Sequence, residues 1–456
     1  MAFDFEDDNY ENIFSEAITI NKYTSQGFEF SSDHKTLLMA PKDIIEFEVP
    51  DFVTTIGPSA FKSCEMLERI VLHDSIRSIA KDAFEYCSAL KTFELPNSIG
   101  IINLSLLYCT SLSSITIPDT VKTIRAFNLR GCKSLKEIRL PKSLETVRLY
   151  LKECTSLSSL IIPESVKEIT SLVFEGCTSL KEIVFTNTLK VGRLDLSYTS
   201  ITSLPDNLKV GGDLCLGHTP IASLPDNLNV GRDLYLNNAP ITSLPDNLKV
   251  KYSIDLSYTP ITSIPNNLKI KNRLNLSHTP ITSLPDNLKT ERINLSHTPI
   301  KVLPNNLCAY SLDLSHTLIT SLPDNLKVRG DLYLSYTPIT SLPDNLKLEG
   351  YLDLSNTSIT SLPDNLEVGD RLDLSNTPIT SLPDNLKVGR VLDLSNTPIA
   401  SLPDNLEVGW NLVLSNTPIT SLPDNLKVGC TLDLSNTPIT SLPDNLKVGC
   451  KVVGLK

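Results

Sequence analysis

Three sets of residues recur at fixed spacing along the chain and have side chains that could do chemistry. Three histidines, His278, His297 and His316, occupy the same place in successive segments. The other two sets consist of aspartates and of cysteines. Imidazoles bind zinc, carboxylates bind cations or exchange protons, and thiols form disulfides or bind metal. The aspartates of the second set are Asp353, Asp373 and Asp393. The cysteines lie 22 or 23 residues apart, at Cys64, Cys87, Cys109, Cys132, Cys154 and Cys177.

The cysteine series is predicted to be structural. Equivalent side chains of stacked parallel segments point the same way, so they do not turn toward each other as a disulfide requires. The sequence has no Cys-x-x-Cys pair, which is evidence against the interpretation of these cysteines as a metal site. Free cysteine behaves as a small apolar residue. We therefore expect buried thiols, with no metal and no cofactor.

The histidines and aspartates are predicted to form rows on an exposed surface. Zinc ligands must converge to about 2.1 Å from one ion, which a parallel row of imidazoles does not favour. Like charges on adjacent strands destabilise a sheet. The aspartates are therefore either presented to a basic partner or simply copied with the repeat, and both interpretations stay open. The serines that follow them have no His-Asp pair beside them, so no catalytic residue is predicted.

The elements that must position these residues come from two internal repeats. In the first array each cysteine is followed by a leucine and then by an apolar alternation. Alternation over a few residues predicts a short half-buried strand, and proline ends it. Four copies read "LKTFELP", "LSSITIP", "LKEIRLP" and "LSSLIIP".

The second array begins at Leu194 and has thirteen units, all of 20 residues except two of 19. Its unit is close to L-x-L-S-x-T-P-I-T-S-L-P-D-N-L-K-V-G-x-x. Two prolines per unit exclude helices locally, and Pro-Asp-Asn is typical of a bend. Asp373 lies between two inward leucines and is expected to point out of the sheet. The inward positions of one unit are predicted to be Leu372, Leu374, Ile379, Leu382, Leu386 and Val388.

A period of 20 to 23 residues with an L-x-x-L-x-L core is typical of leucine-rich repeats. One coil cannot bury its apolar face alone, whereas stacked coils can. The predicted fold is a leucine-rich repeat solenoid: a curved right-handed coil with a parallel sheet on the concave side, mostly irregular turns on the convex side and little helix.

The first array resembles BspA-like leucine-rich repeat proteins. The residues that carry the likeness are "VTTIGPSAFKSCEMLERIVL", "IRSIAKDAFEYCSALKTFELP" and "VKEITSLVFEGCTSLKEIVF". The family unit is close to V-x-x-I-x-x-x-A-F-x-x-C-x-x-L-x-x-I-x-[IL]-P. The resemblance implies surface attachment and protein binding, not catalysis.

The second array is similar to short bacterial-type leucine-rich repeats, with two departures. The first consensus leucine of that repeat type is replaced by glycine or a polar residue. Threonine stands where that repeat type has an asparagine ladder, as at Thr377 and Thr397. We expect its hydroxyl to bond the backbone of the neighbouring coil. The secreted ubiquitin-ligase relatives of that repeat carry a separate catalytic domain with a cysteine. This sequence shows no such domain, so ligase activity is not expected.

Composition and charge limit the classes of partner and the cellular locations that can be expected. The net charge is −11 and no basic stripe is visible, which disfavours nucleic acid. No run of about 18 apolar residues predicts a membrane span. No signal peptide is recognised, so a cytoplasmic location is favoured, with cell-surface display by unconventional export as the alternative. The predicted organisation is an acidic leader at 1–27, BspA-like repeats at 28–190 and the thirteen shorter repeats at 191–456.

Residues that depart from the repeat are the best candidates for binding. Aromatic side chains supply most of the hot-spot energy of protein interfaces. We therefore predict a non-enzymatic scaffold that binds protein through its concave face. The alternative is an adhesin-like surface protein that binds host matrix protein or carbohydrate, and self-association through the C-terminal sheet edge is a further expectation. The aromatic candidates, beside the histidines and aspartates above, are Tyr310, Tyr333, Tyr336 and Tyr351.

Overall fold

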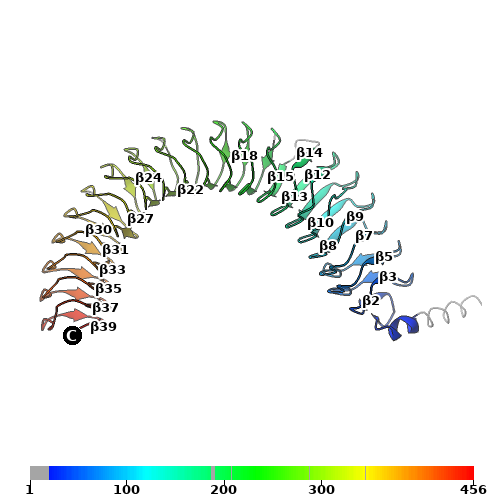
Figure 1. Ribbon diagram of the computed structural model, residues 1–456, viewed down its shortest axis with the longest axis horizontal. Coiled ribbons are helices and arrows are strands. Elements are labelled where there is room, and N and C mark those ends of the chain that lie inside the picture. Colours follow the sequence, from blue (N-terminus) through cyan, green and yellow to red (C-terminus); the bar gives the residue numbers. More distant parts are fainter. Residues whose placement is uncertain (1–19, 186–189, 207, 287, 345, 456) are drawn as a thin grey trace, which may run out of the picture. The chain divides into compact units, whose positions relative to one another are not determined.

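The computed structural model describes residues 20–185, 190–206, 208–286, 288–344 and 346–455 (Figure 1). By its internal packing the chain divides into two compact units, which are described one at a time. Unit 1 comprises Met1–Ile221 with Leu228–Val230, and unit 2 comprises Ala222–Asn227 with Gly231–Lys456. The change of repeat length near residue 190 lies inside unit 1.

Unit 1 contains helical residues 20–25 and then short strands. The strands are β1 (Glu29–Phe30), β2 (Thr36–Met39), β3 (Glu46–Glu48), β4 (Thr55–Ile56), β5 (Arg69–Val71), β6 (Ser78–Ile79), β7 (Thr92–Glu94), β8 (Ile101–Ser105), β9 (Ser114–Thr116), β10 (Thr123–Asn128), β11 (Thr146–Tyr150), β12 (Ser159–Ile162), β13 (Glu168–Val173), β14 (Glu182–Phe185), β15 (Lys190–Asp195), β16 (Lys209–Val210), β17 (Leu214–Cys215) and β18 (Asn229–Val230).

Unit 2 contains shorter strands of the same kind. They are β19 (Leu234–Tyr235), β20 (Lys249–Val250), β21 (Ile254–Asp255), β22 (Arg273–Asn275), β23 (Arg292–Asn294), β24 (Cys308–Ala309), β25 (Ser311–Asp313), β26 (Lys327–Val328), β27 (Leu332–Tyr333), β28 (Lys347–Leu348), β29 (Leu352–Asp353), β30 (Glu367–Val368), β31 (Arg371–Asp373), β32 (Lys387–Val388), β33 (Val391–Asp393), β34 (Glu407–Val408), β35 (Asn411–Val413), β36 (Lys427–Val428), β37 (Thr431–Asp433), β38 (Lys447–Val448) and β39 (Lys451–Val453).

The strands of unit 1 stack coil on coil. β1 and β2 pair antiparallel, and the later strands pair in parallel, as in the series β8, β10, β11, β13, β15. Leu172 of the longer repeat faces Leu194 of the shorter repeat, and Leu194 faces Leu214. The ladder of leucines therefore continues through the change of repeat length.

The predicted alternations are confirmed as strands in three of the four quoted copies. β7, β9 and β12 cover "LKTFELP", "LSSITIP" and "LSSLIIP". The fourth expectation is wrong, because residues 137–140 of "LKEIRLP" are in no strand. The apolar side chains of this copy alternate as in the other three copies, but its backbone does not pair with that of a neighbouring coil to form a strand.

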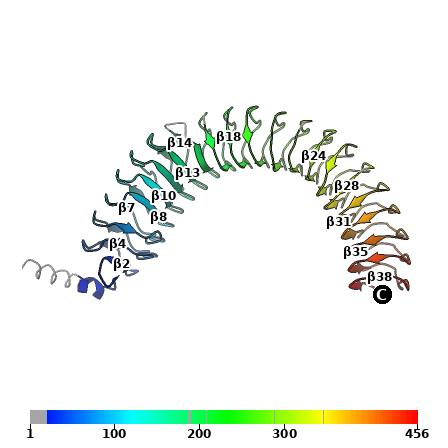
Figure 2. The same cartoon turned by 180° about the vertical axis from the view of Figure 1, so that it is seen from behind.

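Unit 2 has a principal parallel sheet and a second, lateral ladder. The principal sheet, hereafter the strand sheet, joins β19, β21, β22, β23, β25, β27, β29, β31, β33, β35, β37 and β39, one strand per coil. The lateral ladder joins β28, β30, β32, β34, β36 and β38, each shortly before the next strand of the strand sheet. Figure 2 shows these coils from behind, with β28, β31, β35 and β38 following one another.

A glycine makes the tight passage from the lateral ladder to the strand sheet. A Cβ on Gly409 would lie 1.9 Å from the carbonyl oxygen of Gly389, and the same holds for Gly429 against Gly409. Only glycine permits backbones to approach this closely. This explains the glycine that follows Lys-Val in the consensus.

The predicted core is confirmed. Leu372, Leu374 and Ile379 are fully buried, and Leu382, Leu386 and Val388 are buried as well. The six cysteines of the first array are buried free thiols, as expected. Cys132 Sγ lies 3.2 Å from the carbonyl oxygen of Leu106, one coil back, and burial raises the pKa of this thiol to about 12. These thiols connect adjacent coils.

The expected role of threonine is wrong. Thr377 Oγ1 donates to the carbonyl oxygen of Leu374 at 2.6 Å, within its own coil, and Thr397 does the same to Leu394 at 2.7 Å. The coil turns away from the sheet after the strand, and this turn brings the hydroxyl to the carbonyl oxygen three residues back. Backbone bonds make the connection between coils, for example from Leu374 N to Asp393 O at 2.8 Å.

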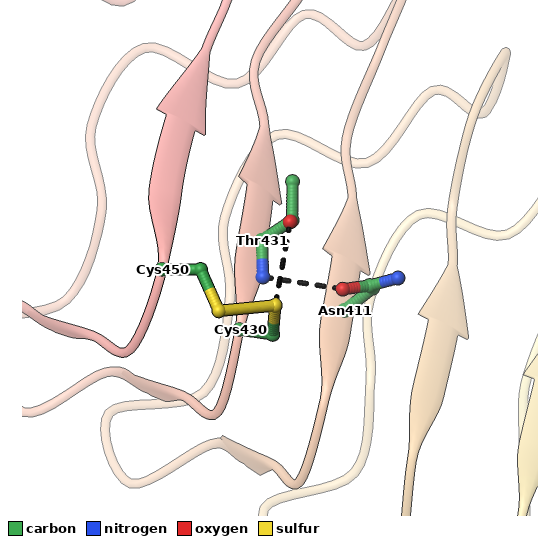
Figure 3. Close-up of a disulfide and its surroundings, with 4 residues drawn as sticks. All are labelled: Asn411, Cys430, Thr431 and Cys450. Carbon is green, nitrogen blue, oxygen red and sulfur yellow. Dashed lines mark hydrogen bonds between the residues drawn. A yellow bond between two sulfur atoms is a disulfide. The ribbon is translucent and has the colours of Figure 1, made fainter.

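A disulfide joins Cys430 and Cys450, one residue before β37 and one before β39 (Figure 3). The Cα atoms are 4.5 Å apart. Equivalent side chains of stacked coils can therefore meet, contrary to the expectation from parallel stacking. That expectation holds for the inward cysteines, but at the turn before the strand the two side chains can rotate toward each other.

Candidate binding surface

The aspartates of the predicted row end the strands of the strand sheet. Asp373 is the last residue of β31, and its Oδ1 accepts a hydrogen bond from the backbone N–H of Ser375 at 3.0 Å. The same bond recurs for Asp353 and Asp393, at 3.0 and 3.1 Å. Asn294 makes it as well, at 2.9 Å, so the role requires no charge. The row acts as a set of strand-ending caps, and presentation to a basic partner stays a prediction.

The histidines lie three residues beyond the strands, in the turn that follows each cap. This turn position has a left-handed backbone in one coil after another, with φ from 56° to 60°. Its occupants are Tyr198, His218, Asn238, Tyr258, His278, His297, His316, Tyr336, Asn356, Asn376, Asn396, Asn416 and Asn436. The row of histidines therefore lies in the turn that adjoins the strands.

Five of these residues stack their rings into one exposed column. Ring centroids are 4.2 Å apart for Tyr258 and His278, 4.3 Å for His278 and His297, 4.2 Å for His297 and His316, and 4.5 Å for His316 and Tyr336. The planes are within 11° of parallel. We call this set of five residues the ring column.

Backbone hydrogen bonds set the spacing of the ring column. The N–H of His278 donates to Ser296 O and that of His297 donates to Ser315 O, each at 3.0 Å. These bonds hold each turn directly over the next, so the rings face one another. Tyr258 and Tyr336 at the two ends are 55% and 56% exposed. The column therefore presents its ring edges to solvent.

The fold does not require rings at this position. Asparagine tolerates the left-handed region, whereas most other residues lose about 1–2 kcal/mol there. Five coils carry asparagine from Asn356 to Asn436 with the same φ. Stacking gains about 0.5–1.5 kcal/mol per pair, which partly offsets the backbone cost and favours rings in consecutive coils.

The surroundings of His278 disfavour protonation of its ring. The pKa of His278 is lowered from its ordinary value of 6.5, first by burial of the ring and then by the charges of His297 and His316. The three imidazoles lie parallel and do not converge on one point. Among the described residues, no group of three or more histidine, cysteine or acidic side chains has the arrangement of a metal site.

Two of the predicted tyrosines belong to a polar cluster on the strand sheet. The rings of Tyr333 and Tyr351 meet edge to face at 5.4 Å, and the Arg371 guanidinium lies 5.5 Å from the Tyr351 ring. Tyr351 Oη donates to Asp373 Oδ2 at 3.2 Å. Arg371 Nη2 bridges Asp373 and Asp393, at 2.7 and 3.1 Å. Like charges on adjacent strands are therefore neutralised within the sheet.

Burial and nearby carboxylates disfavour ionisation of Tyr351. Burial first, and then the charges of Asp373 and Asp353, raise the pKa of Tyr351 well above its ordinary value. Asp373 is buried beneath its partners although it lies on the outward face. Tyr351 is accordingly part of the structure of the sheet, and Tyr336 is the more accessible tyrosine.

Tyr310 lies apart from both groups, just before β25. Its ring covers Gly330, where a Cβ would lie 2.5 Å from Tyr310 Cε1. The predicted residues thus separate into the ring column, the cluster and Tyr310. The predictions missed Tyr258 and Arg371. Alignment of the turn position across all coils would have revealed Tyr258, but the bridging by Arg371 depends on side-chain direction.

The coil-by-coil pairing of parallel strands with buried leucines defines a leucine-rich repeat solenoid with little helix. The family model described as BspA type leucine rich repeat region matches in six copies, over residues 38–151 and 100–211. Residues 38–211 are therefore BspA-type leucine-rich repeats. A comparison with curated protein sequences finds no match.

Several solved structures are similar to the chain. The leucine-rich effector protein YopM from Yersinia pestis is 21% identical over 66% of this chain and 87% of its own, with a TM-score of 0.45. A leucine-rich repeat protein of Leptospira interrogans is 21% identical over 84% of this chain and 95% of its own, with a TM-score of 0.40. A T. pallidum leucine-rich repeat protein is 25% identical over 37% and 82%, with a TM-score of 0.31.

Leucine-rich repeats are repeat scaffolds of a kind that typically binds other proteins, and they are generally not enzymes. In the part of the chain that the structure describes, no helix is both long and apolar enough to cross a membrane.

Proposed function

We propose that this protein is a non-enzymatic scaffold that binds a protein partner through unit 2, with the ring column as the central contact. One observation carries the proposal. Five rings are held exposed and in register at a turn where five later coils of the same unit use asparagine. Folding of the coil therefore does not require the rings, and we assign them to binding.

The physical properties of the column suit a protein interface. Aromatic side chains supply large rigid contact area at low entropic cost, and interfaces are enriched in them. The ring nitrogens of His278, His297 and His316 form no hydrogen bond with protein groups among the described residues, so they can serve a partner. The column spans five coils, which places its contacts in a line along the sheet.

Replacement of the five rings by asparagine tests the proposal. The variant Tyr258→Asn, His278→Asn, His297→Asn, His316→Asn, Tyr336→Asn installs the residue that the chain itself uses at this backbone conformation. It should fold, because Asn376 and its equivalents have the same φ. We expect loss of about tenfold or more in affinity, since central aromatic contacts dominate interfaces.

The measurement is quantitative affinity capture from an extract of the producing organism, with wild type and variant compared. The matched control is Tyr198→Asn with His218→Asn, which removes the other ring stack, centroids 4.3 Å apart, at the same turn position in unit 1. A partner lost with the five substitutions and kept with the control supports the proposal. A partner retained by the five-site variant at full strength contradicts it.

A further inference from the structure

Away from the ring column, unit 2 has a groove whose rim is basic. Four lysines line it: Lys251, Lys269, Lys271 and Lys289. Its floor is apolar and consists of Val250, Leu268 and Ile270, all of them buried. The lysines are exposed. We call these seven residues the lysine groove.

The local sequence explains both the rim and the floor. "KVK" at 249–251 and "KIK" at 269–271 place lysines on either side of an apolar residue. In extended chain successive side chains point to opposite faces, so the apolar residue turns inward and the lysines turn outward. Two adjacent coils with this pattern align their lysines on both sides of the floor.

The groove lies where strand pairing lapses. β20 ends at Val250, residues 269–270 of the next coil are in no strand, and Lys289 of the coil after that forms an isolated bridge with Cys308. Lys251 and Lys271 also occupy the place of the glycine in later coils, where a Cβ would meet a neighbouring carbonyl. A Cβ at this position is therefore excluded in the arrangement that Gly389 and Gly409 adopt.

The charge of the groove is not neutralised within the protein. Later coils of the same unit pair the corresponding lysines, with Lys347 and Lys387 at 3.3 and 3.2 Å from Glu367. Among the described residues, the four groove lysines form no ion pair. This is notable in a chain whose net charge is −11.

The surrounding residues leave the positive charge of the rim in place. The backbone N–H of Glu291 contacts the carbonyl oxygen of Lys271 at 3.4 Å, but its carboxylate makes no ion pair with the rim. The consensus aspartate of the bend is Asn266 in this coil. Lys251 and Lys271 also approach the Tyr252 ring, with Nζ atoms 5.1 and 5.8 Å from its centroid.

We propose that the lysine groove binds an acidic peptide segment of a protein partner, with carboxylates on the lysines and an apolar side chain on the floor. Three adjacent coils span about 10 Å, the reach of roughly three extended residues. A nucleic acid requires a longer basic track along its phosphates, and it has no side chain for an apolar floor. The site is separate from the ring column and does not depend on any contact there.

The test uses the full chain and a fluorescein-labelled peptide of glutamates around one central phenylalanine, followed by fluorescence anisotropy. A peptide with glutamine in place of glutamate is the ligand control. The groove variant carries Lys251→Gln, Lys269→Gln, Lys271→Gln and Lys289→Gln. The matched control variant carries Lys327→Gln, Lys347→Gln, Lys387→Gln and Lys427→Gln, which makes the same change in net charge on exposed lysines of later coils.

We expect the groove variant to bind the acidic peptide about tenfold or more weakly, because four charge contacts are lost together. The control variant should stay within about twofold, and wild-type affinity should fall with added salt. Both variants should keep the wild-type melting curve, since the replaced side chains are exposed. No binding by the wild type, or binding unaffected by the groove substitutions, overturns the proposal. Tighter binding to a single-stranded oligonucleotide or to phosphatidylserine vesicles than to the peptide also overturns it.

Discussion

At the scale of the residue, short polar side chains finish each strand and turn the chain away from the sheet. Asp373 caps the backbone of Ser375, and Thr377 then bonds the carbonyl of Leu374. Both bonds lie within one coil, whereas a backbone bond from Asn376 N to Ser395 O at 3.0 Å holds the same turn over the turn of the next coil. The consensus letters S-x-T thus encode a turn, and the residue between them is free to vary in chemistry.

Thr377→Val tests the threonine bond. Valine keeps the shape of the buried side chain but removes the hydroxyl that donates to Leu374 O at 2.6 Å. We expect the variant to lose about 1 kcal/mol of stability, the usual worth of such a bond. Urea unfolding followed by circular dichroism measures it, with Thr377→Ser as the conservative control. Equal midpoints for wild type and the valine variant would show that the hydroxyl contributes nothing.

The ring column should respond to acid. The pKa of His278 lies below the ordinary 6.5, so the folded protein favours the neutral ring. The resulting stabilisation is present above pH 6.5 and is lost as the pH falls through the lowered pKa. NMR titration should give a pKa below 6.5 for His278. The double variant His297→Asn with His316→Asn should move this pKa toward 6.5, because it removes the neighbouring rings that bury His278 and the charges that disfavour its protonated form. A titration unchanged by the two substitutions would disprove the coupling.

At the scale of the element, a disulfide fastens the last strand of the strand sheet. β39 pairs with β37 from Thr431–Lys451 to Asp433–Val453, and Cys430–Cys450 closes that pair at its start. The covalent link adds to the backbone hydrogen bonds that hold β39 to β37. Self-association through this edge stays a prediction.

Loss of the disulfide should loosen the final coil. For a loop of about 20 residues the chain-entropy model gives about 3 kcal/mol. Cys430→Ser with Cys450→Ser should therefore speed amide hydrogen exchange at residues 431–433 and 451–453, while exchange at β31 stays unchanged. Cys308→Ser is the control, because Cys308 is an exposed free thiol. Equal exchange in the double variant and the control would refute a stabilising role.

At the scale of the whole molecule, near-identical coils build a scaffold, and departures from the consensus place the candidate contacts. In unit 2 the ring column, the polar cluster around Arg371 and the lysine groove each arise in coils that depart from the common unit. The ring column and the lysine groove can be tested independently, because the asparagine substitutions and the glutamine substitutions change different residues. Their separate effects on binding would show whether one partner contacts both.

The core was predictable from the sequence alone because burial follows the period of the side chains. The buried positions from Leu372 to Val388 and the buried thiols could be read from spacing, since equivalent residues of stacked coils share one environment. The histidine stack was predictable for the same reason. A repeat fixes which residues are neighbours.

Only the tertiary structure decided which polar atoms meet and where pairing stops. The threonine bonds its own coil because the backbone turns left-handed three residues after the strand, at Asn376, a dihedral choice that spacing does not reveal. The link between Cys430 and Cys450 needed Cα atoms 4.5 Å apart at a turn. The lysine groove required knowing that residues 269–270 form no strand. Repetition sets the order of the coils, whereas backbone direction and side-chain rotation set the chemistry of their surface.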